Sequence, residues 1–224
     1  MALANFEGKT FLAFVDISGF KKKMNDKEEA LNILNIFYSK GYDILENNKD
    51  KINGIFISDC GILFIKANQS EVDKLKTLLT VIKKLNEEML KKEIMLTNSI
   101  AYGEFKYENK IEFLGIIKNP TYGYAYIDAY FDNEKTEPRI QPGECRIINN
   151  NLPSDVTEEI DKEDKSNNPE FKLVRKVGNS HYYYFWMAKD ESKIDEIQEK
   201  YKDAKYIGML KILKDNIAET GLSI

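Results

Sequence analysis

The chain has 224 residues, the length of one domain, and 42% of them are apolar, so it can bury a core without disulfide bonds or a structural metal. The 33 Lys and Arg against 37 Asp and Glu give a net charge of −4, which argues against non-specific nucleic-acid binding. Two distant cysteines, Cys60 and Cys145, and the single His181 exclude a disulfide framework and a multi-histidine zinc site. With no secretory leader and no run of about 18 apolar residues, the sequence predicts a cytoplasmic protein that does not bind a membrane.

The first part of the chain alternates apolar runs with an amphipathic segment. Residues 11–17 (FLAFVDI) are a continuous apolar run that ends at an acid, which is typical of a buried central strand. Asp26 precedes apolar residues spaced by four and three, which predicts a helix with Asp26 as its N-cap. Residues 52–57 and 62–67 are apolar runs separated by Ser-Asp-Cys-Gly, a pattern that predicts a β-hairpin.

The middle of the chain predicts a second helix over residues 71–92, followed by strands over 94–102 and 111–117. Asn119-Pro120 combines an N-cap residue with proline at the first helical position. This dipeptide predicts a third helix over about residues 121–131.

The last part of the chain is expected to contain short strands at residues 139–140 and 145–148 and a strand over 181–187. Residues 154–170 are rich in acids and predict an exposed, mobile excursion. One or two helices are expected over residues 194–219. Hairpins mixed with helices favour an α+β fold in which helices cover one face of a mainly antiparallel sheet.

Two acids stand out by their positions in these elements. Asp16 ends the first apolar run, and Asp59 lies at the tip of the hairpin. If the first strand pairs with the hairpin, the two carboxylates meet, and their repulsion calls for a cation such as Mg²⁺ or Mn²⁺. The alternative is that Asp16 only caps the next turn and Asp59 is an ordinary turn residue. That turn also offers backbone N–H groups to a triphosphate, from Ile17, Ser18, Gly19 and Phe20.

The segments around these acids resemble class III nucleotidyl cyclases, the family of adenylate and guanylate cyclase catalytic domains. Residues 14–20 (FVDISGF) look like the family's F-x-D-I-x-G-F opening. Residues 57–64 (ISDCGILF) are similar to its acid-bearing hairpin, and residues 99–104 (SIAYGE) are similar to the strand that follows. The resemblance implies a ferredoxin-like class III cyclase-type sheet covered by helices, with residues 1–150 as the cyclase-like core and residues 151–224 adding a C-terminal helical extension to the same domain.

The resemblance also implies a metal site and an assembly. Asp16, Asp59 and the backbone carbonyl of Ile17 would hold two Mg²⁺ or Mn²⁺, as the matching groups do in the family. The catalytic domains of this family work head-to-tail, which implies a homodimer that binds a nucleoside triphosphate. Tyrosines of the third predicted helix are the candidate interface residues, the alternative being that some of them are helix core: Tyr122, Tyr124, Tyr126 and Tyr130.

A narrower branch is suggested by residues 123–130 (GYAYIDAY) and the following Pro138-Arg139-Ile140, which look like Pycsar-type bacterial pyrimidine cyclases. Residues 204–210 are similar to the C-terminal helix of that branch. This likeness implies a pyrimidine substrate and a role in bacterial antiviral signalling.

The sequence departs from class III enzymes where they carry an Asn and an Arg on the helix before the last core strand. The predicted helix offers Tyr126 and Tyr130 instead, with no Asn or Arg. In addition, Thr97 stands two positions before Ser99, where members of the family often carry a second Arg. Removing one charge donor of this kind costs about 10²–10³ in rate. Lys118 and Arg139 are the candidates to supply the missing cation, the alternative being that they are solvated surface charges.

These features predict a nucleotidyl cyclase that prefers CTP or UTP. Ile55 stands where purine-reading members carry a lysine, and Tyr126 and Tyr130 are expected to narrow the base pocket. Two other classes stay open. One is a catalytically silent nucleotide-binding or interaction module, favoured by the missing Asn and Arg. The other is a polymerase-like relative of the same palm, although the hairpin lacks the Gly-Gly-Asp usual there.

Overall fold

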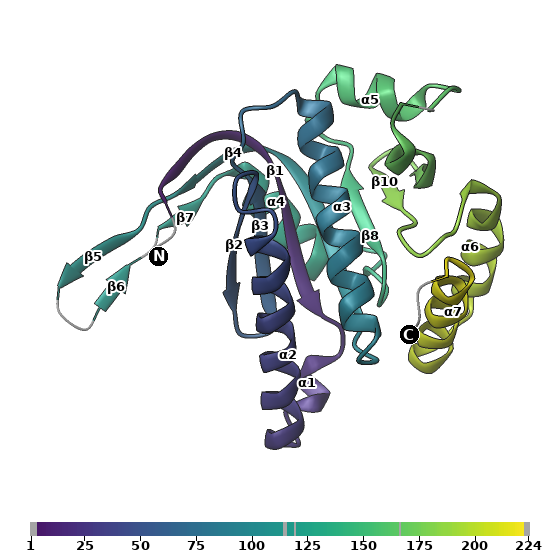
Figure 1. Cartoon of the computed structure of the whole chain (residues 1–224), viewed down its shortest axis with the longest axis horizontal. Helices are drawn as coiled ribbons and strands as arrows, with labels where there is room; N and C mark the ends of the chain where they lie inside the picture. The colour runs from purple at the N-terminus through teal and green to yellow at the C-terminus, as the bar shows by residue number, and fades with distance from the viewer. Residues whose placement is uncertain (1–3, 114–115, 119, 166, 222–224) are drawn as a thin grey trace.

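A computed structural model describes residues 4–113, 116–118, 120–165 and 167–221. An eight-stranded sheet has the order β2-β3-β1-β4-β8-β10-β9, with the short β7 paired to β4 off this path. Its strands are β1 (Phe6–Ile17), β2 (Ile52–Ile57), β3 (Cys60–Ile65), β4 (Leu96–Tyr107), β7 (Thr121–Tyr122), β8 (Cys145–Ile148), β9 (Val174–Val177) and β10 (His181–Tyr184). Two further strands, β5 (Lys110–Phe113) and β6 (Ile116–Lys118), form a separate arm that projects from the body (Figure 1).

The strand β1 lies in the middle of the antiparallel part of the sheet, between β3 and β4. The only parallel pairing among the described strands joins β4 to β8. Alternate residues of β1 belong to two cores: Phe11, Ala13 and Val15 face one, and Leu12 and Phe14 face the other. The continuous apolar run is therefore explained by burial of β1 on both faces.

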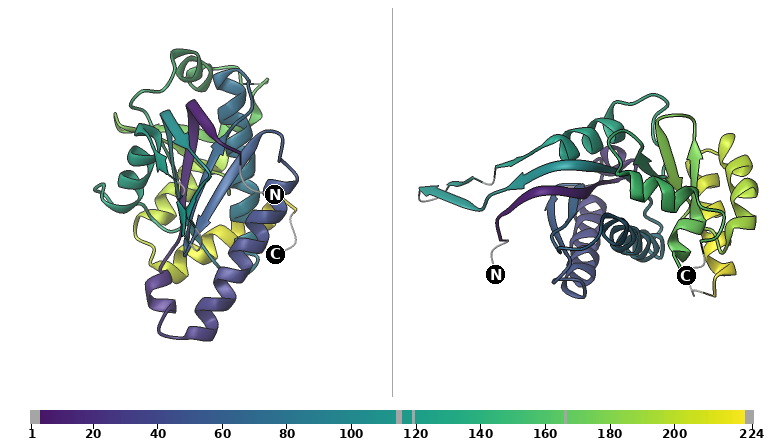
Figure 2. Two further views of the ribbon diagram at one scale, coloured as in Figure 1. Left: turned by 90° about the vertical axis from the view of Figure 1, so that its left-hand side faces the viewer. Right: turned by 90° about the horizontal axis from the view of Figure 1, so that it is seen from above.

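The helices lie on both faces of the sheet, as the view from above shows (Figure 2). The long helices α2 and α3 cover one face, and α4 covers the other. This corrects the expectation that helices would cover one face only. The helices are α1 (Phe20–Lys23), α2 (Lys27–Glu46), α3 (Glu71–Leu90), α4 (Tyr124–Glu134), α5 (Ser154–Asp161), α6 (Ile194–Lys202) and α7 (Tyr206–Glu219), with short 3₁₀ turns at Pro169–Leu173 and Glu191–Lys193.

The start of α2 confirms the predicted N-cap. The carboxylate of Asp26 accepts hydrogen bonds from the backbone N–H groups of Glu28 and Glu29, both at 3.0 Å. These bonds satisfy two of the N–H groups that a helix leaves without an internal partner in its first turn.

Three local predictions were wrong. The helix expected from residue 121 begins at Tyr124, because Thr121 and Tyr122 pair with β4 and Gly123 then turns the chain; Asn119 lies outside the described residues. The strand expected over 111–117 is the two-stranded arm, and residues 139–140 belong to no strand.

The acid-rich segment 154–170, expected to be an exposed and mobile excursion, contains α5 and part of a 3₁₀ turn. Val156 and Ile160, spaced by one helical turn, are buried, and α5 packs on α3. The charged residues lie on the outer side of a docked helix, so their number did not indicate a lack of structure.

The C-terminal helices extend the same body. The larger buried cluster runs without a break from Phe11 in β1 to Ile217 in α7. The helix α6 packs against α7, and α7 contacts α3. Among the described residues, no helix combines the length and the apolar character that crossing a membrane requires.

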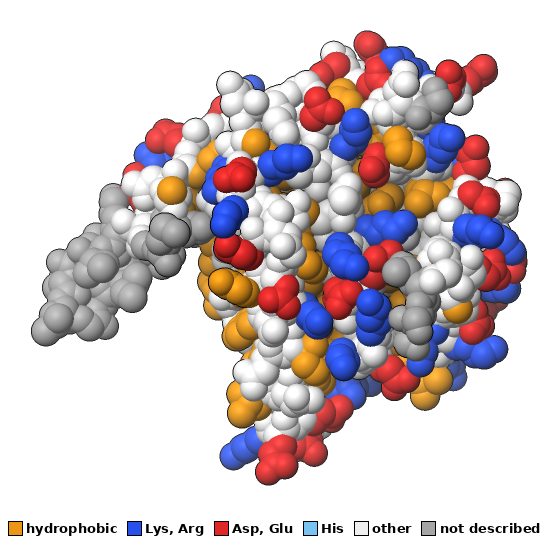
Figure 3. All heavy atoms as spheres, viewed as in Figure 1, with side chains coloured by type: hydrophobic (Ala, Val, Ile, Leu, Met, Phe, Trp, Pro, Cys, Tyr) orange, Lys and Arg blue, Asp and Glu red, His pale blue; other side chains and the backbone are white. Residues whose placement is uncertain are grey.

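An ion-pair network joins α2 to α3 on the face where acidic and basic side chains alternate (Figure 3). Glu88 of α3 accepts a hydrogen bond from Lys91 (2.9 Å) and lies 3.1 Å from Nζ of Lys40 on α2. These contacts, with Lys91 first, lower the pKa of Glu88 from 4.5 to about 2. A carboxylate whose pKa falls on folding adds stability above the unfolded pKa and loses it as the pH falls through the folded pKa.

We therefore expect Glu88→Gln to be less stable than wild type at neutral pH, with a difference that shrinks as the pH falls from 4.5 towards 2. Urea unfolding at several pH values measures this. Glu199→Gln, at an exposed glutamate of α6, is the control and is expected to show no such trend. A Glu88→Gln deficit that stays constant with pH would contradict the assigned network.

Candidate active site

Asp16 is positioned by the register of the central strand. It lies opposite Cys60 of β3 on one side and Thr97 of β4 on the other. Because side chains alternate along a strand, Asp16 is on the same face of the sheet as Leu12 and Phe14, the face that α4 covers. Its carboxylate is therefore held at the end of β1 beneath α4.

Asp59 reaches the same place through the hairpin. The backbone N–H of Ile17 donates to the carbonyl of Asp59 at 3.0 Å, which ties the hairpin tip to the end of β1. Ser58 has a φ of 54°, a left-handed conformation that completes the tight turn. Tyr38 of α2 donates to the carbonyl of Ser58 at 2.8 Å and holds the turn from outside.

The electrostatics of the site are dominated by negative charge. Burial, followed by the charges of Asp59 and Glu134, raises the pKa of Asp16 from 3.8 to about 7. Burial and the same three carboxylates raise the pKa of the Cys60 thiol to about 11, so this cysteine is a poor nucleophile. The site thus gathers carboxylates that are unfavourable together without a neutralising cation.

A cavity of about 250 Å³ opens beside Asp16. Its wall includes Ser18 and Gly19 from the turn after β1, Thr97 from β4, and Asn133 and Glu134 from the end of α4. Two of its polar groups are buried without a hydrogen-bond partner in the described structure, Ser18 Oγ and Asn133 Nδ2. An unpaired buried polar atom costs free energy, so these groups indicate a cavity that a polar ligand completes.

The segment 138–142 forms the remaining wall, with Arg139, Ile140 and Pro142. Arg139 is exposed and has no ion pair with any described residue. Its guanidinium therefore lines the cavity that contains Asp16, and no described residue neutralises its charge.

The predicted base-reading residues lie on the α4 face of the sheet near this cavity. Ile55, Tyr126 and Tyr130 are half-buried against the smaller core. The Tyr130 ring packs edge-on to Phe14 at 5.4 Å between centroids and lies 6.2 Å from the Tyr126 ring. They form an apolar and aromatic wall, although none of them lines the 250 Å³ cavity itself.

Other predicted ligand residues contribute less. The side chains of Ile17 and Phe20 are buried in the main core, so only backbone atoms of these residues can contact a ligand. The Ile17 N–H already donates to the carbonyl of Asp59 and is not free for a phosphate. The N–H of Ser18 donates to the carbonyl of Met95 at 2.9 Å and is not free for a phosphate. Lys118 lies on β6 of the projecting arm, and its side chain is outside the described structure.

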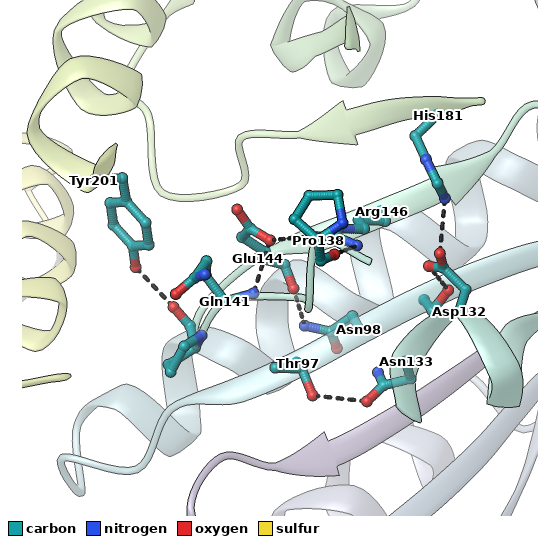
Figure 4. Close-up of polar contacts among 12 residues, drawn as sticks. Thr97, Asn98, Asp132, Asn133, Pro138, Gln141, Glu144, Arg146, His181 and Tyr201 are labelled. Carbon is teal, nitrogen blue, oxygen red and sulfur yellow. Dashed lines mark hydrogen bonds and ion pairs between the residues drawn. The ribbon is translucent and has the colours of Figure 1, made fainter. Parts of the chain in front are cut away.

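Five residues that line the cavity were not predicted as site residues: Thr97, noted only as the replacement of an arginine, and Asn133, Glu134, Ile140 and Pro142. The predicted helix ended at residue 131, whereas α4 continues to Glu134 and so carries an asparagine after all. The Thr97 hydroxyl donates to Asn133 Oδ1 at 3.1 Å, which directs Nδ2 elsewhere (Figure 4). No arginine lies on α4, as expected. Counting one more helical turn would have found both α4 residues.

A buried network fixes this end of α4. Asp132 accepts a hydrogen bond from Ser99 of β4, and its other oxygen lies 2.7 Å from Nε2 of His181 on β10 (Figure 4). The sheet thus holds Asp132, and the next two residues of α4, Asn133 and Glu134, line the cavity.

The C-terminal helices touch both loops of the cavity. Tyr206 at the start of α7 donates to the carbonyl of Ser18 at 3.4 Å. Tyr201 of α6 donates to the carbonyl of Pro142 at 2.9 Å. The helical extension therefore supports the turn after β1 and the segment 138–142.

The donor set fits a hard divalent cation. In the described residues, no three His, Cys, Asp or Glu side chains form a ready-made metal cluster. Mg²⁺ commonly needs only one or two carboxylates, because it keeps waters and shares phosphate oxygens with its substrate. Asp16 and Asp59 meet that requirement. The pKa of Asp16 is raised first by burial and then by the charges of Asp59 and Glu134, and a bound cation would offset both effects.

Comparison with known proteins relates the fold to one group. No protein-family model and no curated sequence matches the chain. Among solved structures, the guanylate cyclase domain of RhGC from Catenaria anguillulae in complex with GTP is 14% identical, with a TM-score of 0.57 over 81% of this chain and 97% of that chain. A non-canonical dimeric guanylyl cyclase domain of the RhoGC fusion protein from Blastocladiella emersonii is 14% identical, with a TM-score of 0.56 over 82% of this chain and 98% of that chain.

A bacterial light-regulated adenylyl cyclase is 12% identical, with a TM-score of 0.55 over 98% of this chain and 59% of that chain. Identities this low establish the fold and not the activity. The chain has the fold of class III adenylyl and guanylyl cyclase domains.

Proposed function

We propose that the protein is a nucleotidyl cyclase that converts a nucleoside triphosphate to a 3′,5′-cyclic nucleotide and pyrophosphate. The observation that carries this proposal is the cavity in which the Asp16 carboxylate, two unpartnered polar atoms and the unpaired Arg139 meet. A triphosphate with its cations supplies both the positive charge and the hydrogen-bond acceptors that such a cavity lacks.

In the reaction, the ribose 3′-oxygen attacks the α-phosphorus, and the bond to the bridging oxygen of the leaving pyrophosphate breaks. Asp16 and Asp59 would hold two Mg²⁺ or Mn²⁺, with the Ile17 carbonyl as a further ligand by the family resemblance. Those ions, when bound, supply charge that favours loss of the hydroxyl proton and neutralises the phosphates. Asn133 Nδ2 and the Arg139 guanidinium would donate hydrogen bonds to phosphate oxygens and so hold the triphosphate in place for the attack.

We expect CTP or UTP to be turned over at least about tenfold faster than ATP or GTP. Ile55 has no donor for a purine edge, and Tyr126 and Tyr130 occupy space beside it. Product formation from the four labelled triphosphates with Mn²⁺, separated by thin-layer chromatography and identified by mass, tests both the cyclase activity and the base preference.

Ile55→Lys would introduce a base-edge donor and is expected to raise turnover of purines relative to pyrimidines, whereas Ile55→Met keeps the wall apolar and serves as control. Equal turnover of ATP and either pyrimidine by the wild type would reject the pyrimidine preference and leave the cyclase proposal intact. By the resemblance to Pycsar-type enzymes, a cyclic pyrimidine product would act as a signal in bacterial antiviral defence.

A silent nucleotide-binding module is the second candidate. The absence of an arginine from α4 favours it, because the transition-state charge then depends on Arg139. Binding of a triphosphate in the presence of Mn²⁺ without any cyclic product in the same assay would support this candidate over the enzyme.

We further propose that two copies associate head-to-tail. Four large apolar side chains on β7 and α4 are exposed: Tyr122, Tyr124, Ile127 and Phe131. The three on α4 are spaced by three and four positions and therefore form a stripe on one face of the helix. Tyr126 and Tyr130, which were also expected at an interface, are half-buried against the smaller core instead. One structural neighbour is a non-canonical dimeric guanylyl cyclase domain, and another structure of the domain from the same fusion protein is monomeric. The first supports association of two copies, and the head-to-tail arrangement rests on the family resemblance.

We expect light scattering to show a dimer at micromolar concentration. Ile127→Asp is expected to raise the dissociation constant of the dimer by about tenfold or more, because the new charge would be buried at the interface. Ile207→Asp is the matched control, since Ile207 is 81% exposed on α7, away from the stripe. A wild-type chain that stays monomeric with and without nucleotide would reject the dimer.

A further inference from the structure

A second and larger cavity lies beyond β8, between the sheet and α6. Its volume is about 600 Å³, within the range of small-molecule sites. One wall comes from β8 and β10, a second from the segment 138–144, and a third from α6 and the start of α7. Asp16 and Asp59 take no part in it.

The floor of this cavity contains a buried arginine. Arg146 of β8 is 2% exposed; its Nη1 donates to the carbonyl of Pro138 (2.8 Å) and its Nη2 to Glu144 (3.2 Å), as Figure 4 shows. Its Nε is buried and has no hydrogen-bond partner in the described structure. A guanidinium that is held rigidly but incompletely bonded is a strong anchor for an anion.

The charged side chains of the cavity wall carry a net positive charge. Glu144 pairs with Arg146, so the remaining charged groups of the wall are Arg139, Lys202 and Asp203. Neither Arg139 nor Lys202 makes an ion pair with another residue in the described part of the chain. An anionic group placed between them would be neutralised without displacing an existing partner.

Aromatic side chains supply the other half of the wall. The Tyr183 ring lies 5.3 Å from the Arg146 guanidinium carbon and 6.5 Å from the Phe185 ring, and Tyr201 faces the cavity from α6. Rings in this arrangement pack well against a planar ligand. Arg139 lines both this cavity and the candidate active site, so an occupant would touch the wall that the two cavities share.

We propose that this second cavity binds a small organic anion that carries a planar ring, with its charge on Lys202 and Arg139 above Arg146 and its ring against Tyr183 and Phe185. The site shares Arg139 with the proposed nucleotide site and is otherwise lined by different residues. Its ligand is defined by two features together, an anionic group and a ring.

The test uses two fluorescent probes that differ in charge. 1-Anilinonaphthalene-8-sulfonate carries the rings and a negative charge, and N-phenyl-1-naphthylamine carries the rings alone. We expect the sulfonate to bind the folded full chain with a stoichiometry of one. Lys202→Glu is expected to weaken sulfonate binding by about fivefold or more and to leave the neutral probe unaffected. Lys205→Glu, three positions away and outside the cavity wall, is the matched control and is expected to bind as wild type does.

Two more variants separate this site from the first. Gln198→Phe, at an exposed position of the cavity wall, fills the space and is expected to weaken both probes. Asp16→Asn is expected to leave sulfonate binding unchanged, so the result does not depend on the proposed cyclase activity. No saturable binding, or equal sulfonate affinity in Lys202→Glu, Lys205→Glu and Gln198→Phe, would overturn the proposal.

Discussion

The variants Asp16→Asn and Asp59→Asn are each expected to form cyclic nucleotide about 10³-fold more slowly than the wild type, or not at all. Each substitution removes one of the two carboxylates that the fold brings to the end of β1. Isothermal titration calorimetry with Mn²⁺ is expected to show that both variants lose metal binding.

The same substitution at Asp16 is expected to preserve or increase stability in metal-free buffer at neutral pH. A carboxyl whose pKa rises from 3.8 to about 7 on folding destabilises the folded state as the pH rises between those values. Asparagine removes this cost, so loss of activity with gain of stability identifies a functional and not a structural role. Asp43→Asn, at an exposed aspartate of α2, is the control. Wild-type turnover by both site variants would show that the site is wrongly assigned.

Gly123→Ala is expected to destabilise the protein by about 3 kcal/mol or more and to displace α4. Gly123 has a φ of 131°, which a residue with a Cβ adopts only under strain, and the added Cβ would lie 2.2 Å from the carbonyl oxygen of Glu104. The obstacle is the backbone of β4, which cannot move without breaking its pairing with β1. Urea unfolding measures the loss.

Gly178→Ala is the matched control. Gly178 also has a positive φ, 66°, but an added Cβ there meets no atom within 4 Å. Only the backbone strain remains, so the expected cost is about 1 kcal/mol. A similar loss of unfolding free energy in both variants would show that β4 leaves room for a Cβ at position 123.

The parts of the fold that follow local rules were predictable. The run at residues 11–17 predicted a buried central strand because burial on both faces leaves no polar alternation. The hairpin around Asp59 and the N-cap at Asp26 depend on a few neighbouring residues, and both are present. The pairing of this hairpin with β1 was sufficient to place Asp16 beside Asp59.

The rest of the site depends on contacts between distant segments. Asn133 and Glu134 reach the cavity because Thr121 and Tyr122 form β7, so that α4 begins only at Tyr124 and ends at Glu134. Arg139 belongs to a segment without regular structure, so no periodicity indicates where it points. The second cavity is invisible to any local pattern, because its walls come from a strand pair, a loop and two helices.

The bond from Tyr206 to the carbonyl of Ser18 spans 188 positions of the chain. During synthesis, β1 and the hairpin leave the ribosome and can pair long before α7 exists, because domains form from the segments already available. Closing a loop of this length adds an entropic cost that the final contacts must repay, so this contact forms late. A nascent or truncated chain that ends before Tyr206 carries both carboxylates but lacks the outer support of the turn beside them. An unfinished chain therefore has both carboxylates before it has this support from α7.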